Sequence, residues 1–273
     1  MKKIIFLIYG IIFFFSGCFD LDSALFNKKT LSSYSLRTGV IPESSRTQIV
    51  LTSQGKKIYG YFVKSNGVDS SYTILYNHGN KDHLQYYWDR VELLYKTGCN
   101  VFVYDYQGYG MSEGEPSEEG LYSDAEAALT YIRSRGGVNQ TKIACYGFSL
   151  GCAAAIHLAA NVFTPNVLIL EAPFASTSAL VQSGTLLDMP SSYVMKGEYN
   201  NAEKIKKVIA PLLLFHGESD KFIDIEKNGA VVFKNAKNPK TFIRVAGADH
   251  SQVPAKFGEN EYISTVRDFI RAH

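Results

Sequence analysis

Short runs of β-branched and aromatic residues alternate along this chain with longer segments whose apolar residues recur at helical spacing. Strands joined by crossover helices build a mostly parallel sheet, with helices covering both of its faces. We expect eight strands, the first two forming a hairpin, at 47–51, 58–63, 72–77, 100–104, 142–146, 167–170, 211–215 and 241–245. Covering helices are expected at 84–96, 118–135, 150–160, 223–233 and 260–271. The pattern therefore predicts the α/β fold class.

Composition limits both the domain count and the partners. With 273 residues, 46% of them hydrophobic, the chain can bury a large core, and no linker interrupts its middle, so we expect one domain over 38–273. The formal net charge is +2, with basic residues scattered among acidic ones, which argues against a nucleic acid partner. Cys99, Cys145 and Cys152 lie in apolar segments and are expected to be buried free thiols.

The N-terminus differs from the rest of the chain. Lys2 and Lys3 precede an apolar run over 4–15, and small residues follow it. This is the layout of a secretory signal, and the run is shorter than the about 20 residues that a membrane-spanning helix needs. We therefore predict a signal peptide at 1–17 and an exported protein.

The stretch from Phe15 to Cys18 resembles a bacterial lipobox, in which the cysteine becomes the lipidated first residue of the mature protein. The resemblance implies lipid attachment at Cys18, a tether over 18–37, and a protein anchored to a membrane of the bacterial cell envelope. The first lipobox position is usually Leu, and here it is Phe15. Ordinary secretion and an uncleaved anchor are the alternatives.

A Gly-x-Ser-x-Gly motif stands at 147–151, directly after a predicted strand and directly before a helix of small residues. The motif alone arises by chance in many chains, but a strand, a sharp turn and a helix are the context of a nucleophile elbow. Side chains in place of Gly147 or Gly151 would collide with the neighbouring strand and helix. We predict that Ser149 is a nucleophile; the alternative is a Gly-rich turn in which it only caps the helix.

A serine hydroxyl needs a base within hydrogen-bond reach to become a nucleophile. Of the six histidines, His250 follows the last predicted strand, and the base comes last in the chain order serine, acid, histidine. His78 and His83 precede the serine, His157 lies in the helix after it, and His273 ends the chain. We therefore predict His250 as the base, against the alternative of a surface-loop histidine.

The acid that orients the base should follow the penultimate strand. Asp220 stands there, with Glu218 and Asp224 as rivals, and a helix cap is the structural alternative for Asp220. His216, Glu218 and Asp220 alternate in a way that could suggest metal ligands, but a single histidine at a strand exit makes that interpretation weak, and no metal is expected.

The negative charge of a tetrahedral intermediate needs preformed donors. Two backbone N–H groups are candidates, one at Leu150 and one at Asn80 in the loop after the third strand. His78, in the same loop, is interpreted as structural.

Together these residues resemble the α/β-hydrolase superfamily, and most closely the small serine hydrolases that include acyl-protein depalmitoylases and related membrane-associated esterases. The resemblance covers nearly all of the chain after the export segment and is most specific over 104–114 and 116–125. It implies an eight-stranded sheet, no cofactor, and a catalytic triad with an oxyanion hole. Family members usually carry Arg where Gln107 stands, so an ion pair near the sheet should be missing. The implied site residues are Ser149, Asp220 and His250 for the triad, and Asn80 and Leu150 for the oxyanion hole.

The expected reaction is hydrolysis of a carboxylic ester or thioester through an acyl-enzyme on Ser149. The stretch 174–204 is long and rich in Ser, Tyr and Met, and is predicted to form a short cap over the site. Met189, Tyr193 and Met195 in this cap, together with the lipid anchor, favour acylated substrates. Two alternatives stay open: a serine peptidase or aminoacyl hydrolase with the same triad, and a non-catalytic envelope lipoprotein that binds a partner on this scaffold.

Overall fold

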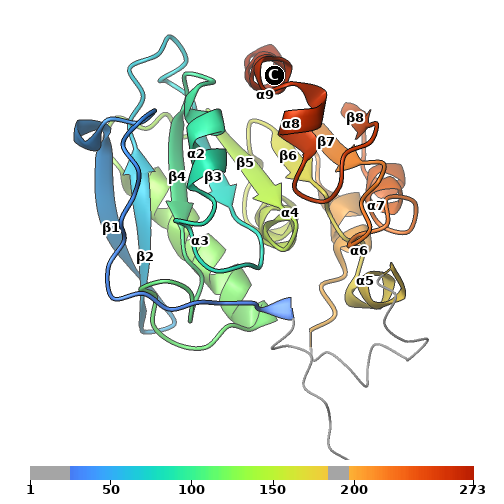
Figure 1. Cartoon of the computed structure of the whole chain (residues 1–273), viewed down its shortest axis with the longest axis horizontal. Coiled ribbons are helices and arrows are strands. Elements are labelled where there is room, and N and C mark those ends of the chain that lie inside the picture. Colours follow the sequence, from blue (N-terminus) through green and yellow to red (C-terminus); the bar gives the residue numbers. More distant parts are fainter. Residues whose placement is uncertain (1–24, 184–196) are drawn as a thin grey trace, which may run out of the picture.

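The computed structural model describes residues 25–183 and 197–273. The predicted signal peptide, the lipid attachment at Cys18 and the first part of the tether lie outside these residues, as do Met189, Tyr193 and Met195 of the cap. Within them, eight strands form one sheet in the order β1-β2-β4-β3-β5-β6-β7-β8 (Figure 1). The strands are β1 (Arg46–Ser53), β2 (Lys56–Val63), β3 (Thr73–Asn77), β4 (Asn100–Tyr104), β5 (Ile143–Phe148), β6 (Leu168–Glu171), β7 (Leu212–Gly217) and β8 (Lys240–Val245).

The sheet is mixed but mostly parallel. β2 pairs antiparallel with both β1 and β4, and every neighbour from β4 to β8 is parallel. The β1–β2 hairpin turns at Gln54 and Gly55, both with positive φ. The predicted fold class, with its eight strands and opening hairpin, is confirmed.

Helices cover the sheet on both faces. They are α2 (Trp88–Tyr95), α3 (Glu118–Ser134), α4 (Gly151–Asn161), α5 (Thr177–Ser183), α6 (Asn201–Lys204), α7 (Gly229–Asn235), α8 (Val253–Phe257) and α9 (Glu259–Ala272), with 3-10 turns at Glu43–Ser45 and Ile205–Lys207. No helix in the described ranges is both long and apolar enough to span a bilayer.

Two helices begin later than predicted. The expected helix at 223–233 is α7, and the residues before it form turns in which Asp224 Oδ1 accepts from Lys227 N at 2.8 Å. Side-chain carboxylates that bond nearby amides compete with helix formation. The helix expected from residue 84 begins at Trp88, because Tyr86, Tyr87 and Trp88 each donate to the carbonyl three positions earlier and so form turns in place of α-helix.

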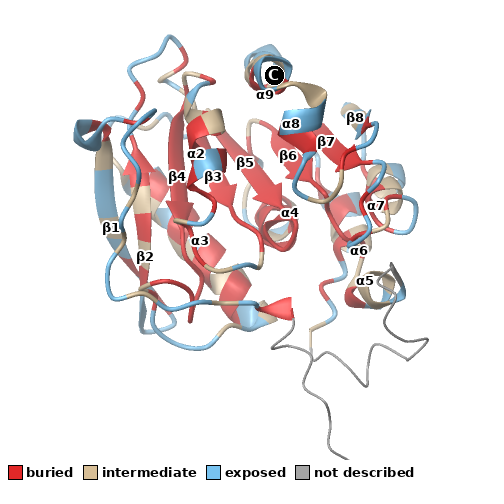
Figure 2. Ribbon diagram, in the orientation of Figure 1, coloured by how far each residue is buried: buried red, intermediate tan, exposed pale blue. Residues whose placement is uncertain are grey.

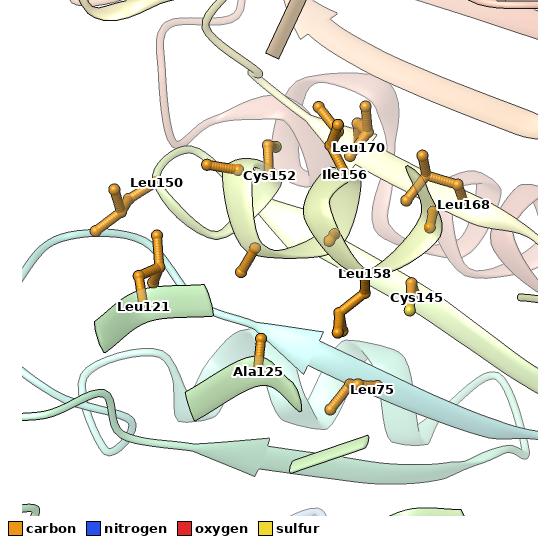
Figure 3. Close-up of a cluster of buried hydrophobic side chains, with 14 of the residues drawn as sticks. Leu75, Leu121, Ala125, Cys145, Leu150, Cys152, Ile156, Leu158, Leu168 and Leu170 are labelled. Carbon is orange, nitrogen blue, oxygen red and sulfur yellow. The ribbon is translucent and has the colours of Figure 1, made fainter. Parts of the chain in front are cut away.

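The core lies in two layers, one on each face of the sheet. Successive strand side chains point to opposite faces, so Ile74 belongs to one layer and Leu75 to the other. The layer of Leu75 packs under α3 and α4, and Figure 3 shows Leu150 beside Leu121 within it. Figure 2 shows the central strands buried along their length, whereas β1 at the sheet edge is largely exposed. Cys99, Cys145 and Cys152 are buried free thiols, as predicted.

The β4–α3 loop, between Tyr104 and Glu118, bears on two further expectations, the tether and the missing ion pair at Gln107. Residues 25–37, which we placed in the tether, lie against the domain, with Leu25 and Phe26 buried. Gln107, where relatives of this type usually carry Arg, donates from its side-chain amide to Asp124 Oδ1 at 3.0 Å and from its backbone N–H to Oδ2 at 2.7 Å. Burial raises the pKa of Asp124 and outweighs the hydrogen bonds from Gln107 and Ser53, which lower it, so these neutral donors offset the burial only in part.

Candidate active site

Ser149 sits in a strained turn between β5 and α4. Its φ is +53°, a left-handed conformation that costs a residue with a side chain about 1–3 kcal/mol. The flanking glycines leave room for the turn: a Cβ on Gly147 would lie 2.6 Å from Cys152 Cα, and one on Gly151 would lie 2.0 Å from the carbonyl oxygen of Asn77. The glycine requirement expected from the sequence therefore has a direct steric cause.

His250 links the serine to a carboxylate. Its Nε2 lies 3.0 Å from Ser149 Oγ, and its Nδ1 lies 2.8 Å from Asp220 Oδ2. Ser149 and Asp220 are buried, and His250 is half-buried between the rings of Phe148 and Phe222. Three side chains separated along the sequence thus form one hydrogen-bonded chain, with distances suited to proton transfer.

Asp220 is held so that one oxygen faces His250. Its Oδ1 accepts from Phe222 N at 2.9 Å and from Ile223 N at 2.8 Å, which leaves Oδ2 for the imidazole. Asp220 therefore does cap the local backbone, as considered for it, but in a turn and not at a helix start, and it contacts His250 at the same time. The rivals make other contacts: Glu218 pairs with Arg244, and Asp224 bonds its own turn.

His216, which the sequence brought up only as a weak candidate metal ligand, is a neighbour of Asp220. It is buried, and its Nε2 lies 2.9 Å from the Ile223 carbonyl oxygen and 3.3 Å from Asp220 Oδ2. Burial alone would raise the pKa of Asp220, but hydrogen bonds from His216 and His250 outweigh it and hold that pKa well below its ordinary value. Asp220 is therefore ionised at neutral pH.

The other histidines make structural contacts. His78 is buried against Tyr106 and Tyr87, and His157 on α4 pairs with Glu126 on α3. Burial lowers the pKa of His83. Across the described ranges, no cluster of three or more His, Cys, Asp or Glu side chains could hold a metal ion.

One of the two predicted oxyanion donors lines the cavity that contains the serine, and the other follows the serine in the chain. Leu150 follows Ser149 at the start of α4, and Asn80 lines a cavity of about 460 Å³ next to Ser149 and His250. Among the described residues, neither the Leu150 nor the Asn80 backbone N–H donates to a protein acceptor. The remaining wall of the cavity consists of Lys81, Tyr86, Tyr87, Asp89, Arg90, Phe148 and Ser251.

A buried ion pair lies next to the turn that contains Ser149, because one of its two residues is hydrogen-bonded to the Ser149 backbone. Arg90 on α2 pairs with Glu171 Oε2, which also accepts from Tyr262 OH at 2.9 Å and from Tyr146 OH. The backbone carbonyl of Glu171 accepts from Ser149 N at 2.9 Å. No motif marks Arg90 or Glu171, and their separation of 81 positions leaves no local signal for the pair.

Comparison with known proteins gives relatives of this chain. Residues 69–191 match the family described as serine aminopeptidase, S33, a match that includes Ser149 and ends before Asp220. Human alpha/beta hydrolase domain-containing protein 17B is 33% identical over 220 residues, covering 80% of this chain and 73% of the relative. Protein 17C of Xenopus tropicalis is 32% identical over 220 residues, covering 80% and 67%. A solved esterase of Pyrococcus furiosus is similar in fold, with a TM-score of 0.72, 18% identity and coverage of 91% of this chain and 97% of that one.

Proposed function

The chain is a serine hydrolase of the α/β-hydrolase superfamily, in the family that includes alpha/beta hydrolase domain-containing proteins 17B and 17C, and from this we propose its reaction. It cleaves carboxylic ester or thioester bonds through an acyl-enzyme on Ser149. The observation that carries the proposal is the unbroken hydrogen-bonded chain from Ser149 Oγ through His250 to Asp220. A purely structural loop has no need to align these three groups, one of them on a strained backbone.

In the first step Ser149 Oγ bonds to the acyl carbon while its proton passes to His250 Nε2. The carbonyl oxygen becomes an oxyanion, for which the N–H groups of Leu150 and Asn80 are the proposed donors. The imidazolium is stabilised by Asp220, which stays ionised. When the tetrahedral intermediate collapses, the bond to the leaving group breaks and His250 returns the proton to the leaving oxygen or sulfur. Water then attacks the acyl-enzyme by the same route, releasing the acid and restoring Ser149.

The site favours an acyl chain as the group transferred to serine. Phe148, Tyr86 and Tyr87 give one part of the cavity wall an aromatic surface beside Ser149, and the rest of the wall is polar. Leu25, which is hydrogen-bonded to the Asn80 side chain, lies seven residues after Cys18, and seven residues span at most about 25 Å. A lipid on Cys18 would thus keep the site close to a membrane, where acylated substrates are found.

A peptidase or aminoacyl hydrolase is the second candidate, because residues 69–191 match a family described as serine aminopeptidase. The deciding experiment is a panel of p-nitrophenyl esters of increasing chain length, assayed beside acyl thioesters and peptide amides. We expect turnover of esters and thioesters, with amides slower by orders of magnitude. Amide turnover equal to that of esters would establish the peptidase instead. A folded protein inactive on every member would support the binding lipoprotein.

We propose further that residues 1–17 are removed on export and that Cys18 carries the lipid, which the composition of this segment supports. Labelled palmitate should enter the protein expressed in a bacterium that processes lipoproteins, and should not enter a Cys18→Ala variant. The matched control is Cys99→Ala, which removes a buried thiol and should label like the parent. If Cys18→Ala took up as much palmitate as the parent, or if the parent took up none, the lipid attachment would be refuted. Ordinary secretion and an uncleaved anchor would then be the remaining explanations of the N-terminal segment.

A further inference from the structure

The N-terminal strap, which we define as residues 25–34, is bound to two loops, one of which lines the serine cavity. In Figure 1 it is the blue segment that enters at the lower edge of the domain and runs beneath the sheet. One attachment is to the β3–α2 loop: Asp82 N donates to Asn27 O at 2.8 Å, and Lys29 N donates to Asp82 O at 2.9 Å. The strap thus forms a two-sided backbone bridge with the loop that contains Asn80.

The second attachment is to the β4–α3 loop. Gly110 N donates to Lys29 O at 2.9 Å, and Leu31 N donates to Gly110 O at 2.7 Å. Tyr34 OH donates to Asp105 Oδ2. Lys29 therefore uses its N–H on one loop and its carbonyl on the other, and ties the two together.

Asn80 is the point at which the strap reaches the proposed oxyanion hole. Its side-chain Nδ2 donates to the Leu25 carbonyl at 2.9 Å, and its own carbonyl accepts from Tyr109 OH at 2.9 Å. The side chain and the carbonyl of Asn80 are held in this way, and its backbone N–H has no acceptor among the described residues. That N–H belongs to the peptide whose carbonyl is on Gly79, 2.7 Å from His78 Nδ1. The strap and Tyr109 therefore hold Asn80 in place, and His78 contacts the peptide that carries its N–H.

The strap is also anchored by burial. Leu25 and Phe26 are only 8% and 5% exposed, and they belong to the same apolar layer as Leu150, the other proposed donor residue. The strap is therefore packed into the domain and hydrogen-bonded to it, whereas a linker would be solvent-exposed along its length.

We propose that the strap is a positioning element of the active site, which fixes the Asn80 N–H for the oxyanion through the Asn80 side chain and the Lys29 bridge. The inference rests on the function proposed above, since it assigns the strap a role in stabilising the oxyanion of that reaction. Misplacing a donor costs catalysis without weakening ground-state binding, because the charge develops only in the transition state. The strap should therefore govern kcat and leave KM nearly unchanged.

The test uses the full chain and a pair of variants at one position. Lys29→Pro removes the N–H that binds Asp82, whereas Lys29→Ala keeps it and removes only the side chain. We expect Lys29→Pro to lower kcat by about 10- to 100-fold, less than the about 100- to 1000-fold typical of losing a donor outright, with KM within about twofold. Lys29→Ala should match the parent. A boronic acid, whose tetrahedral adduct with serine puts an oxygen in the oxyanion hole, should lose affinity by the same factor as kcat.

Asn80→Leu provides a second route, because it is close in size, carries no charge and removes the amide donor to Leu25. It should also lower kcat and boronate affinity together, with an unchanged thermal unfolding midpoint. The proposal is overturned if either variant keeps the parent kcat, or if kcat falls only in proportion to the unfolded fraction. An inactive parent protein would instead refute the proposed function, so the two failures are distinguishable.

Discussion

Replacing Asp220 by Asn should abolish most of the activity while leaving the fold intact. Asp220 Oδ1 accepts two backbone N–H groups, from Phe222 and Ile223, so the carbonyl oxygen of Asn must take that position. The Asn amide nitrogen then takes the place of Oδ2, 2.8 Å from His250 Nδ1. A donor at that place forces Nδ1 to act as the acceptor. The imidazole proton then sits on Nε2, facing Ser149, and His250 cannot accept the serine proton.

The expected loss is about 10⁴-fold in kcat, the size found when the same change produces the wrong tautomer in a serine protease triad. This corresponds to about 5 kcal/mol of transition-state stabilisation, at about 1.4 kcal/mol for each tenfold. The variant keeps the two backbone hydrogen bonds but loses a charge that stabilises the folded state, so kcat is normalised to the folded fraction measured by circular dichroism.

The assay is p-nitrophenyl ester hydrolysis, with Asp224→Asn and Glu218→Gln as matched controls. Both control carboxylates lie in the same segment and neither contacts His250, so their variants should stay within a few-fold of the parent. The reasoning is refuted if Asp220→Asn keeps a tenth or more of the parent kcat, or if either control loses as much.

Three further predictions concern stability. Gly151→Ala should lower the free energy of unfolding in urea by about 3 kcal/mol or more, because the new Cβ would collide with the Asn77 carbonyl. Gly136→Ala is the control: there is open space around Gly136, so the free energy of unfolding should change by less than about 0.5 kcal/mol. Arg90→Met should cost about 3–5 kcal/mol by leaving the Glu171 carboxylate buried and unpaired, and adding Glu171→Gln should recover most of that loss. The pKa of Asp220 is lower in the folded state than in the unfolded state, so its charge stabilises the folded state above about pH 4. This stabilisation is lost as pH falls further and the carboxylate becomes protonated. The difference in unfolding free energy between the parent and Asp220→Asn should therefore shrink from about pH 5 to about pH 2.

The parts of the site that the sequence could predict depend on local geometry or chain order. The elbow was predictable because its turn needs glycine at fixed offsets from Ser149, and the structure gives the clash distances behind that need. His250 could be chosen because only it and His273 follow the last strand, and His273 is the final residue of the chain. The structure brings it to Ser149 and Asp220, while their chemical roles stay proposals.

The parts that escaped prediction depend on contacts between distant segments. Arg90 and Glu171 are 81 positions apart, and nothing near either one signals the other. His216 shares a segment with Asp220, but its role depends on a turn that brings the two side chains together. The strap looked like a linker because it is polar and lacks periodicity, and most of its bonds come from backbone groups that any sequence has.

The central claim is that Ser149 is a nucleophile activated by His250. Its most direct test is fluorophosphonate labelling of the folded protein, followed by mass spectrometry of the labelled peptide. We predict one adduct, on Ser149, that is absent from Ser149→Ala and forms far more slowly in His250→Ala. Labelling that persists in Ser149→Ala, or a folded parent protein that does not react, would contradict the claim.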